Sequence, residues 1–233
     1  MITLLLATRN AHKIAEIQAI LGQSFGYLSL KDFPNPPEVI EDAPTFAGNA
    51  TKKAVVLADW ISKSLITGKR DASPSFVLGD DSGLEVDVLH GAPGVYSARY
   101  AGLDTGTAGN SSDADNSSKL LRQLLHVAPE KRTARFRCVL ALTPIIEENN
   151  QNASPVCYAN ELELATELFE GACEGSIAAA PRGKGGFGYD PLFIPIGYEK
   201  TFAEMAPDAK NHLSHRARAL AELKRRLVQM DIP

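Results

Sequence analysis

The amino-acid sequence predicts an α/β fold, in which buried strands and amphipathic helices alternate along the chain. Apolar runs such as Ile2–Thr8 and Phe76–Gly79 have the length and composition of buried strands. Between such runs, apolar residues recur at the spacing of helices that cover a sheet. The 233 residues suffice for one large domain or for two small lobes around a shared sheet. The sequence contains no internal repeat and no clear domain linker.

The first half of the chain shows this alternation most clearly. Asn10 is placed to cap a first helix, and Thr45 is placed to cap a second. Four prolines exclude long regular structure between Pro34 and Phe46. The expected elements are a strand at Ile2–Thr8, a helix over Ile14, Ile17, Ile20 and Leu21, a strand at Gly26–Leu30, a helix over Ala50, Ala54, Leu57, Ala58 and Ile61, a helix end and loop at Ser62–Ser75, and two strands at Phe76–Gly79 and Leu84–Val88.

The second half contains long polar stretches between its expected elements. Gly91–Ser118 is glycine-rich, and a loop of that length in a compact domain is usually functional or disordered. The expected elements are a helix at about Ser117–Leu125, a strand at Arg132–Pro144, a hairpin loop at Glu147–Pro155, one or two strands within Val156–Ala178, a glycine-rich loop at Pro181–Pro191, and an amphipathic helix over Asn211–Met230.

Composition and charge exclude several classes of protein. A net charge of −4 and an isoelectric point near 5.8 argue against a nucleic-acid partner bound through a broad basic surface. The three cysteines, Cys138, Cys157 and Cys173, are widely spaced, which predicts free thiols in a reducing compartment rather than a disulfide framework or a zinc site. The apolar start of the chain lacks the basic region of a signal peptide, and no run reaches membrane-spanning length. We therefore expect a cytoplasmic protein without a membrane partner.

Two polar clusters carry lysines beside predicted helices. The stretch TRNAHK, Thr8 to Lys13, follows the first strand and opens a helix, where free main-chain N–H groups favour an anion. In EDAPTFAGNATKKA, Asn49 and Lys53 lie four residues apart on one helix face, so that Lys53 can reach the same anion as Lys13. The alternatives are an Asn-capped helix with an exposed lysine, and a solvated polar helix face.

The stretch GDDSG, Gly79 to Gly83, ends an apolar run in two adjacent acids. Unpaired carboxylates at the end of a buried strand are costly, and magnesium typically binds one or two carboxylates together with phosphate oxygens. Consecutive side chains of a strand point to opposite faces, so Asp80 and Asp81 are expected to have different roles. The alternative is an Asp-Ser-Gly turn between hairpin strands.

Two further clusters have the chemistry of a base-binding site. In GKGGFGYDP, Phe187 or Tyr189 can stack on a planar ring, and Asp190 can accept a hydrogen bond from a base. In KNHLSHR, Lys210, His215 and Arg216 surround the start of the last helix. The alternative is a glycine-rich connection with its aromatic residues in the core. Taken together, lysines for phosphate, acids for a metal and a base-stacking loop are the parts of a nucleotide site.

These motifs resemble those of the inosine triphosphate pyrophosphatases. The similarity runs over nearly the whole chain and in order, through LATRNAHK, EDAPTFAGNATKKA, DDSGLEVDVLHGAPGVYSARYAG, GGFGYDPLF and SHR. It implies substrate-binding residues, metal-binding acids and one catalytic acid. By this resemblance Thr8, Arg9, Asn10, Ala11, His12, Lys13, Lys53, Ser82, Phe187, Gly188, Tyr189, Asp190, Lys210, His215 and Arg216 bind substrate, Glu41 and Asp81 bind the metal, and Asp81 is also catalytic.

The resemblance also implies the fold, the reaction and the partners. The family fold is an elongated mixed β-sheet with flanking helices in two lobes and an active-site cleft between them, here one domain over residues 1–233. The expected reaction is hydrolysis of ITP, dITP and XTP to the monophosphate and pyrophosphate, with Mg²⁺ as cofactor and a homodimer as the assembly. Arg9 departs from the glycine of many bacterial members, and the Ser62–Ser75 and Glu147–Pro155 loops look longer.

Two other functions compete with this interpretation. A Maf-like pyrophosphatase would act on pyrimidine or modified nucleotides, but the FGYDP loop followed by SHR favours a purine. A nucleotide-binding module without catalysis would not need the water-orienting acid, so the combination of Glu41, Asp81, Lys13 and Lys53 argues against it.

Overall fold

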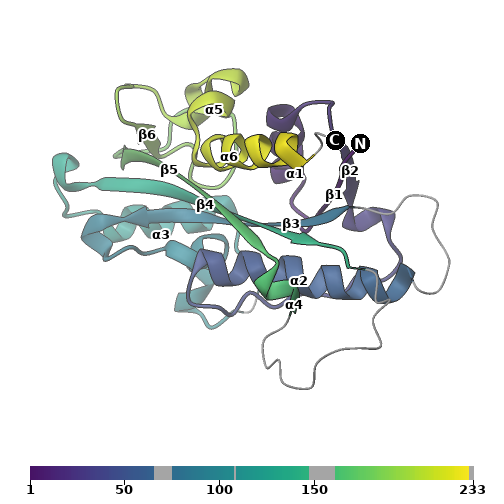
Figure 1. Cartoon of the computed structure of the whole chain (residues 1–233). Coiled ribbons are helices and arrows are strands. Elements are labelled where there is room, and N and C mark those ends of the chain that lie inside the picture. Colours follow the sequence, from purple (N-terminus) through teal and green to yellow (C-terminus); the bar gives the residue numbers. More distant parts are fainter. Residues whose placement is uncertain (66–74, 108, 147–160, 231–233) are drawn as a thin grey trace. The chain divides into compact units, whose positions relative to one another are not determined.

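The computed structural model describes residues 1–65, 75–107, 109–146 and 161–230 (Figure 1). The expected hairpin loop at Glu147–Pro155 lies outside the described residues, as do most of the expected loop at Ser62–Ser75 and the first part of Val156–Ala178. Within the described part, no helix is both long enough and apolar enough to cross a membrane.

Six strands form one mixed sheet, which confirms the predicted α/β class. The order across the sheet is β2-β1-β3-β4-β5-β6. Strand β1 pairs in parallel with β2 and with β3, whereas β5 pairs antiparallel with β6. The strands are β1 Thr3–Leu6, β2 Gly26–Ser29, β3 Phe76–Val86, β4 Thr133–Pro144, β5 Glu167–Ile177 and β6 Phe193–Pro195.

The helices include the three that the apolar spacing predicts most clearly, at the start, after the proline-rich segment and at the end of the chain. The α-helices of the described part are α1 Ala11–Leu21, α2 Phe46–Leu65, α3 Asp113–Gln123, α4 Glu161–Leu164, α5 Pro207–Leu213 and α6 His215–Met230. Short 3-10 helices are η1 Leu30–Asp32, η2 Asp87–Leu89, η3 Gly94–Arg99, η4 Ala101–Asp104, η5 Pro129–Lys131 and η6 Phe202–Glu204.

The chain groups into two compact units, each assembled from separate stretches. The first unit contains Met1–Asp81, Val139–Phe169 and Leu220–Pro233. The second unit contains Ser82–Cys138 and Glu170–Ala219. The boundary in β3 falls between Asp81 and Ser82, so the two acids and the serine of the GDDSG stretch belong to different units.

In the first unit, the chain changes direction across the sheet at β1. Helix α1 connects β1 to β2, which is the neighbour of β1 on one side within the sheet. Helix α2 then connects β2 to β3, which is the neighbour of β1 on the other side. Right-handed crossovers in opposite directions put α1 and α2 on opposite faces of these parallel strands. The carboxyl end of β1, whose last residue pairs with Leu78 within β3, is therefore a topological switch point, the place where open α/β sheets bind ligands.

The second unit has its own apolar core around an aromatic cluster. Phe136 of β4 packs against Phe193 and Phe202, with ring centroids 4.7 and 5.9 Å away. Leu84 and Leu192 are completely buried in the same core. This core underlies the glycine-rich loop that precedes β6.

Three expected element boundaries are wrong. The two strands expected around Asp80–Gly83 are one strand, β3, because both acids have partners and no turn is needed. The last helix is interrupted at Ser214, whose extended backbone separates α5 from α6, although the apolar spacing continues through it. Helix α3 begins at Asp113 rather than near Ser117, because Ser112 caps it by accepting from the main-chain N of Asp115.

The segment Val156–Ala178 also differs from its expected strands. Its described part begins with the short helix α4, and only Glu167–Ile177 is strand. The short strand β6 was not expected, because its three residues carry no pattern of their own.

Candidate functional site

The stretch from Thr8 to Lys13 forms the turn after β1 and the first turn of α1. Asn10 caps the helix, as predicted, because its Oδ1 accepts from the main-chain N of His12 at 2.9 Å and of Lys13 at 3.3 Å. The main-chain N of Asn10 donates to Oγ1 of Thr8 at 3.1 Å. Arg9, Ala11 and His12 are exposed. The exposure of these three residues leaves the helix start accessible to an anion, although the cap already occupies the main-chain N–H groups of His12 and Lys13.

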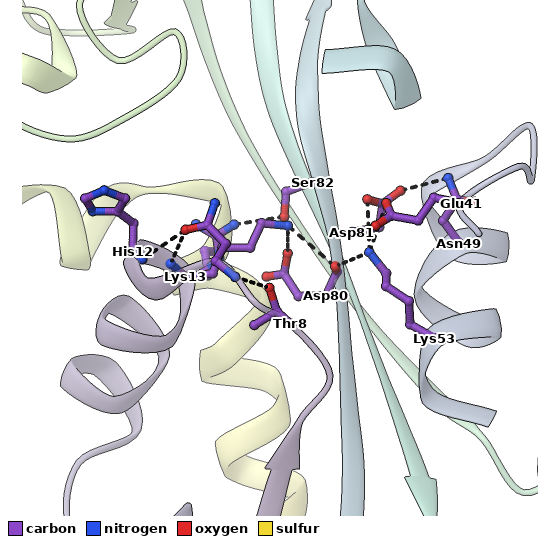
Figure 2. A network of polar contacts seen from close by, with 11 residues as sticks. Thr8, His12, Lys13, Glu41, Asn49, Lys53, Asp80, Asp81 and Ser82 are labelled. Atoms are coloured by element: carbon purple, nitrogen blue, oxygen red, sulfur yellow. Dashed lines mark hydrogen bonds and ion pairs between the residues drawn. The ribbon is translucent and has the colours of Figure 1, made fainter. Parts of the chain in front are cut away.

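Asp80 faces α1 and is paired with Lys13 (Figure 2). Nζ of Lys13 lies 2.5 Å from Oδ1 of Asp80, whose side chain is almost completely buried. The main-chain O of Asp80 accepts from Nζ of Lys53 at 2.7 Å. Asp80 therefore holds both lysines next to the switch point, one through its side chain and one through its main chain.

Asp81 faces α2, on the opposite side of β3 from the Asp80 side chain (Figure 2). Its Oδ2 accepts from Nδ2 of Asn49 at 3.1 Å, and its Oδ1 lies 3.4 Å from Nζ of Lys53. Nζ of Lys53 also lies 3.2 Å from Oε2 of Glu41. The predicted alternation of the two aspartates is thus confirmed, and Glu41, Lys53 and Asp81 form one cluster.

The two carboxylates of this cluster respond differently to their surroundings. For Asp81, burial raises the pKa and the negative charge of Glu41 adds to the rise, while Lys53 and Lys13 oppose it. For Glu41, burial acts in the same direction, but Lys53, with a smaller effect from Lys13, brings the pKa below its usual value. Two acids that share one lysine in this way are a place where a cation would lower the energy of both charged groups.

Glu41 and Asp81 are the acids of this cluster that could hold a metal ion. In the described residues, no group of three or more His, Cys, Asp or Glu side chains has the arrangement of a metal site. Magnesium usually takes one or two protein carboxylates and completes its shell with water and substrate phosphates. The adjacent pair of oxygen donors, with lysines for phosphate beside it, matches that donor set.

In the second unit, the loop between β5 and β6 is built around Asp190. Oδ2 of this buried acid accepts from the main-chain N of Phe187 at 2.9 Å and from Nζ of Lys210 at 2.6 Å. The same Nζ lies 5.0 Å from the centre of the Phe187 ring. The main-chain N of Gly188 donates to Asp113 at the start of α3, at 2.6 Å. The acid, the lysine and one ring face are therefore fixed relative to one another.

Tyr189 and Phe187 differ in exposure, which separates their roles. Tyr189 is 3% exposed, and its hydroxyl donates to the main-chain O of Ser97 at 2.9 Å. Burial raises the pKa of this hydroxyl far above its usual value. Phe187 is only half-buried. The core alternative therefore holds for Tyr189, which anchors the loop, and Phe187 is the aromatic ring able to stack on a ligand.

His215 and Arg216 begin α6 inside the second unit. Nη2 of Arg216 donates to Oγ of Ser82 at 3.0 Å, and its guanidinium lies 5.9 Å from the Phe187 ring centre. The ring of His215 stacks on Phe136, with centroids 4.8 Å apart and planes 13° apart. Ser82, Phe187, Lys210, His215 and Arg216 thus belong to one group of polar and aromatic side chains.

The residues around these sites differ in how far the sequence indicates them. Asn49 shares a helix face with Lys53, a spacing that the sequence shows, and it contacts Asp81 from that face. Asp113, Ser97 and Phe136 reach the loop or His215 from distant parts of the chain, and no local pattern indicates them.

Comparison with known proteins places these features in a family. A family model described as the Ham1 family matches residues 4–226. A protein named dITP/XTP pyrophosphatase from Geobacter sulfurreducens is 47% identical over 225 residues, or 96% of each chain. A protein of the same name from Shouchella clausii is 42% identical over 221 residues, which cover 95% of this chain and 94% of that protein.

Solved structures show the same fold. A HAM1 protein from Coxiella burnetii gives a TM-score of 0.76 at 35% identity, over 98% of this chain and 100% of that chain. The Ham1 protein of Staphylococcus aureus gives a TM-score of 0.73 at 30% identity, with the same coverage.

Proposed function

Because this chain belongs to the Ham1 family, we propose that it hydrolyses the non-canonical purine nucleotides ITP, dITP and XTP to the monophosphate and pyrophosphate. The observation that carries the proposal is the cluster at the switch point of the first unit. There Glu41 and Asp81 both contact Lys53, and Lys13 belongs to the first turn of α1. Acids for a metal and lysines for phosphates are what cleavage of a phosphoric anhydride needs.

Each residue of this cluster has a defined task in the reaction. Water adds to the α-phosphorus, the bond from that phosphorus to the bridging oxygen breaks, and pyrophosphate leaves. Lys13 and Lys53 bind the phosphate oxygens and stabilise the charge that develops on the leaving group. Glu41 and Asp81 would hold Mg²⁺, which when bound would neutralise part of the negative charge of the substrate. Asp81 orients the attacking water, and Asn10 keeps the helix start in the shape that binds an anion.

The second unit supplies the groups that recognise the base. Phe187 stacks on the purine ring, while Lys210, His215 and Arg216 provide N–H donors for its 6-oxo oxygen. Adenine carries an amine at that position, so a donor would face a donor. A buried polar group left without its partner is the physical basis of large discrimination between such ligands.

Three broader properties belong to the same proposal. Residues 1–233 act as one pyrophosphatase domain. The assembly is a homodimer and the location is the cytoplasm. Light scattering of the purified chain measures the assembly directly, and a monomer at micromolar concentration would contradict it.

The proposed function is tested by pyrophosphate release from ITP, XTP, dITP, GTP, ATP and TTP in the presence of Mg²⁺. We expect strong preference for ITP, XTP and dITP, and no release when EDTA removes the metal. Preference for TTP would instead support a Maf-like pyrophosphatase. Tight binding of ITP without release would support a nucleotide-binding module.

A further inference from the structure

Asn49 is completely buried in the first turn of α2, and the roles described above leave it without a task. Its side-chain amide makes two hydrogen bonds. Oδ1 accepts from the main-chain N of Ala43 at 2.9 Å, and Nδ2 donates to Oδ2 of Asp81 at 3.1 Å. A carboxamide supplies both an acceptor and donors in one neutral group. It can therefore hold a main-chain N–H and a carboxylate at the same time, which neither an acid nor an aliphatic side chain can do.

These two bonds connect the acids that fit the metal. Ala43 lies two residues after Glu41, in a stretch between η1 and α2 that has no helix or strand. The bond to Ala43 fixes the course of that stretch, and the bond to Asp81 fixes one oxygen of its carboxylate. Lys53 contacts the other oxygen of Asp81 and also Glu41. One buried amide thus sets the position of both carboxylates relative to α2.

Helix α2 is itself held close to β3 at this point. A Cβ atom on Gly79 would lie 2.3 Å from the main-chain O of Ala50, so only glycine allows this approach. Asn49 precedes Ala50, and Asp81 follows Gly79 by two residues. The close contact of the two backbones therefore brings the Asn49 amide to the Asp81 carboxylate, as Figure 2 shows.

We propose that Asn49 is a positioning residue for the metal ion, acting by orienting Asp81 and anchoring the Glu41 segment. The inference rests on the proposed function, because it gives Asn49 a task at the same site. Partners that orient metal-binding side chains without touching the metal typically contribute 10–100-fold to metal affinity or activity.

The test compares Asn49→Leu and Asn49→Ser with the wild-type chain. Leu removes both hydrogen bonds, and Ser is too short to span the two partners. We expect the Mg²⁺ concentration for half-maximal ITP hydrolysis to rise about 10–100-fold, with little change in KM for ITP at saturating Mg²⁺. Electron paramagnetic resonance of Mn²⁺, with the α,β-methylene analogue of ITP bound, should show a weakening of the same size without turnover.

Asn116→Leu is the matched control. Asn116 is also a buried asparagine near the start of a helix, but its amide bonds only main-chain groups, the N of Ala101 and the O atoms of Ala98 and Ser111. We expect this variant to lose thermal stability while its half-saturating Mg²⁺ concentration stays at the wild-type value.

The outcomes separate this inference from the function on which it rests. A wild-type chain that releases no pyrophosphate from ITP would overturn the proposed function. If the wild type is active and the Asn49 variant that folds keeps its affinities for Mg²⁺ and Mn²⁺, only the positioning role of Asn49 is overturned. If Asn49→Leu does not fold, the Mg²⁺ and Mn²⁺ affinities of Asn49→Ser are compared with those of the wild type instead.

Discussion

At the scale of single residues, Asp80 and Asp81 are neighbours in the chain with different surroundings. Asp80 pairs with Lys13 on the α1 side, whereas Asp81 lies with Asn49 and Lys53 on the α2 side. The strand geometry enforces this separation, because consecutive side chains point to opposite faces. Asp80 holds lysines in place, and Asp81 remains the acid that shares a site with Glu41.

Asp81→Asn should have opposite effects on activity and on stability. Turnover of ITP should fall ~100-fold or more, because the neutral amide lacks the negative charge with which Asp81 would hold the metal and orient the attacking water. The raised pKa of Asp81 means that its surroundings disfavour the charged form, so at neutral pH the ionised group destabilises the metal-free fold. The melting temperature in EDTA should therefore rise. Near-normal turnover would contradict the assignment of Asp81.

Lys53→Met should destabilise the chain far more than Lys52→Met. Loss of Lys53 leaves Glu41 and the buried Asp81 without their shared cation, a change that typically costs about 3–5 kcal/mol. Lys52 pairs with exposed Asp42, and such surface pairs contribute little to stability because water screens them. Urea unfolding in EDTA measures both. Equal losses of unfolding free energy in the two variants would contradict a stabilising role for the charge of Lys53.

At the scale of elements, the glycine-rich loop before β6 positions Asp190 through backbone geometry. Gly186 has a φ of +72°, and a Cβ there would lie 2.0 Å from Oδ2 of Asp190. That oxygen already accepts from Phe187 and Lys210. The loop therefore depends on glycine at this position for two reasons, the backbone conformation and the space for the carboxylate.

Gly186→Ala should lower kcat/KM for ITP by roughly 100-fold, because it displaces the Asp190 carboxylate and the groups bound to it. Gly106→Ala is the control, since Gly106 has a similar φ of +67° and open space around its Cβ position. Both variants should lose about 1–2 kcal/mol of stability from the left-handed backbone. Only the first should lose activity, and equal kinetics in the two would contradict the role of the loop.

At the scale of the whole molecule, the sequence predicts the elements whose patterns are local. The strand β1, the Asn10 cap, α1 and α2 follow from apolar spacing and capping residues. The continuous strand β3 does not, because paired acids normally indicate a turn and the partners of these two, Lys13, Asn49 and Lys53, are distant in the sequence. The break at Ser214 is hidden for a similar reason, since the apolar spacing runs through it.

The candidate site is predictable to a similar extent. The motifs identify Lys13, Glu41, Lys53 and Asp81, and the structure brings the last three into contact. The burial of Tyr189 and the stacking of His215 on Phe136 depend on packing between remote segments. Such contacts leave no pattern in a single sequence, so they appear only once the chain is folded.

We expect this chain to cleave the α–β anhydride bond of ITP, dITP and XTP in preference to that of ATP. Phosphorus-31 NMR of a mixture of ITP and ATP with Mg²⁺ and the purified chain tests it directly, because one spectrum reports both the substrate consumed and the bond broken. We predict that ITP disappears first, with IMP and pyrophosphate as the products, while ATP remains intact. Equal consumption of ATP, or formation of IDP and inorganic phosphate, would contradict the account.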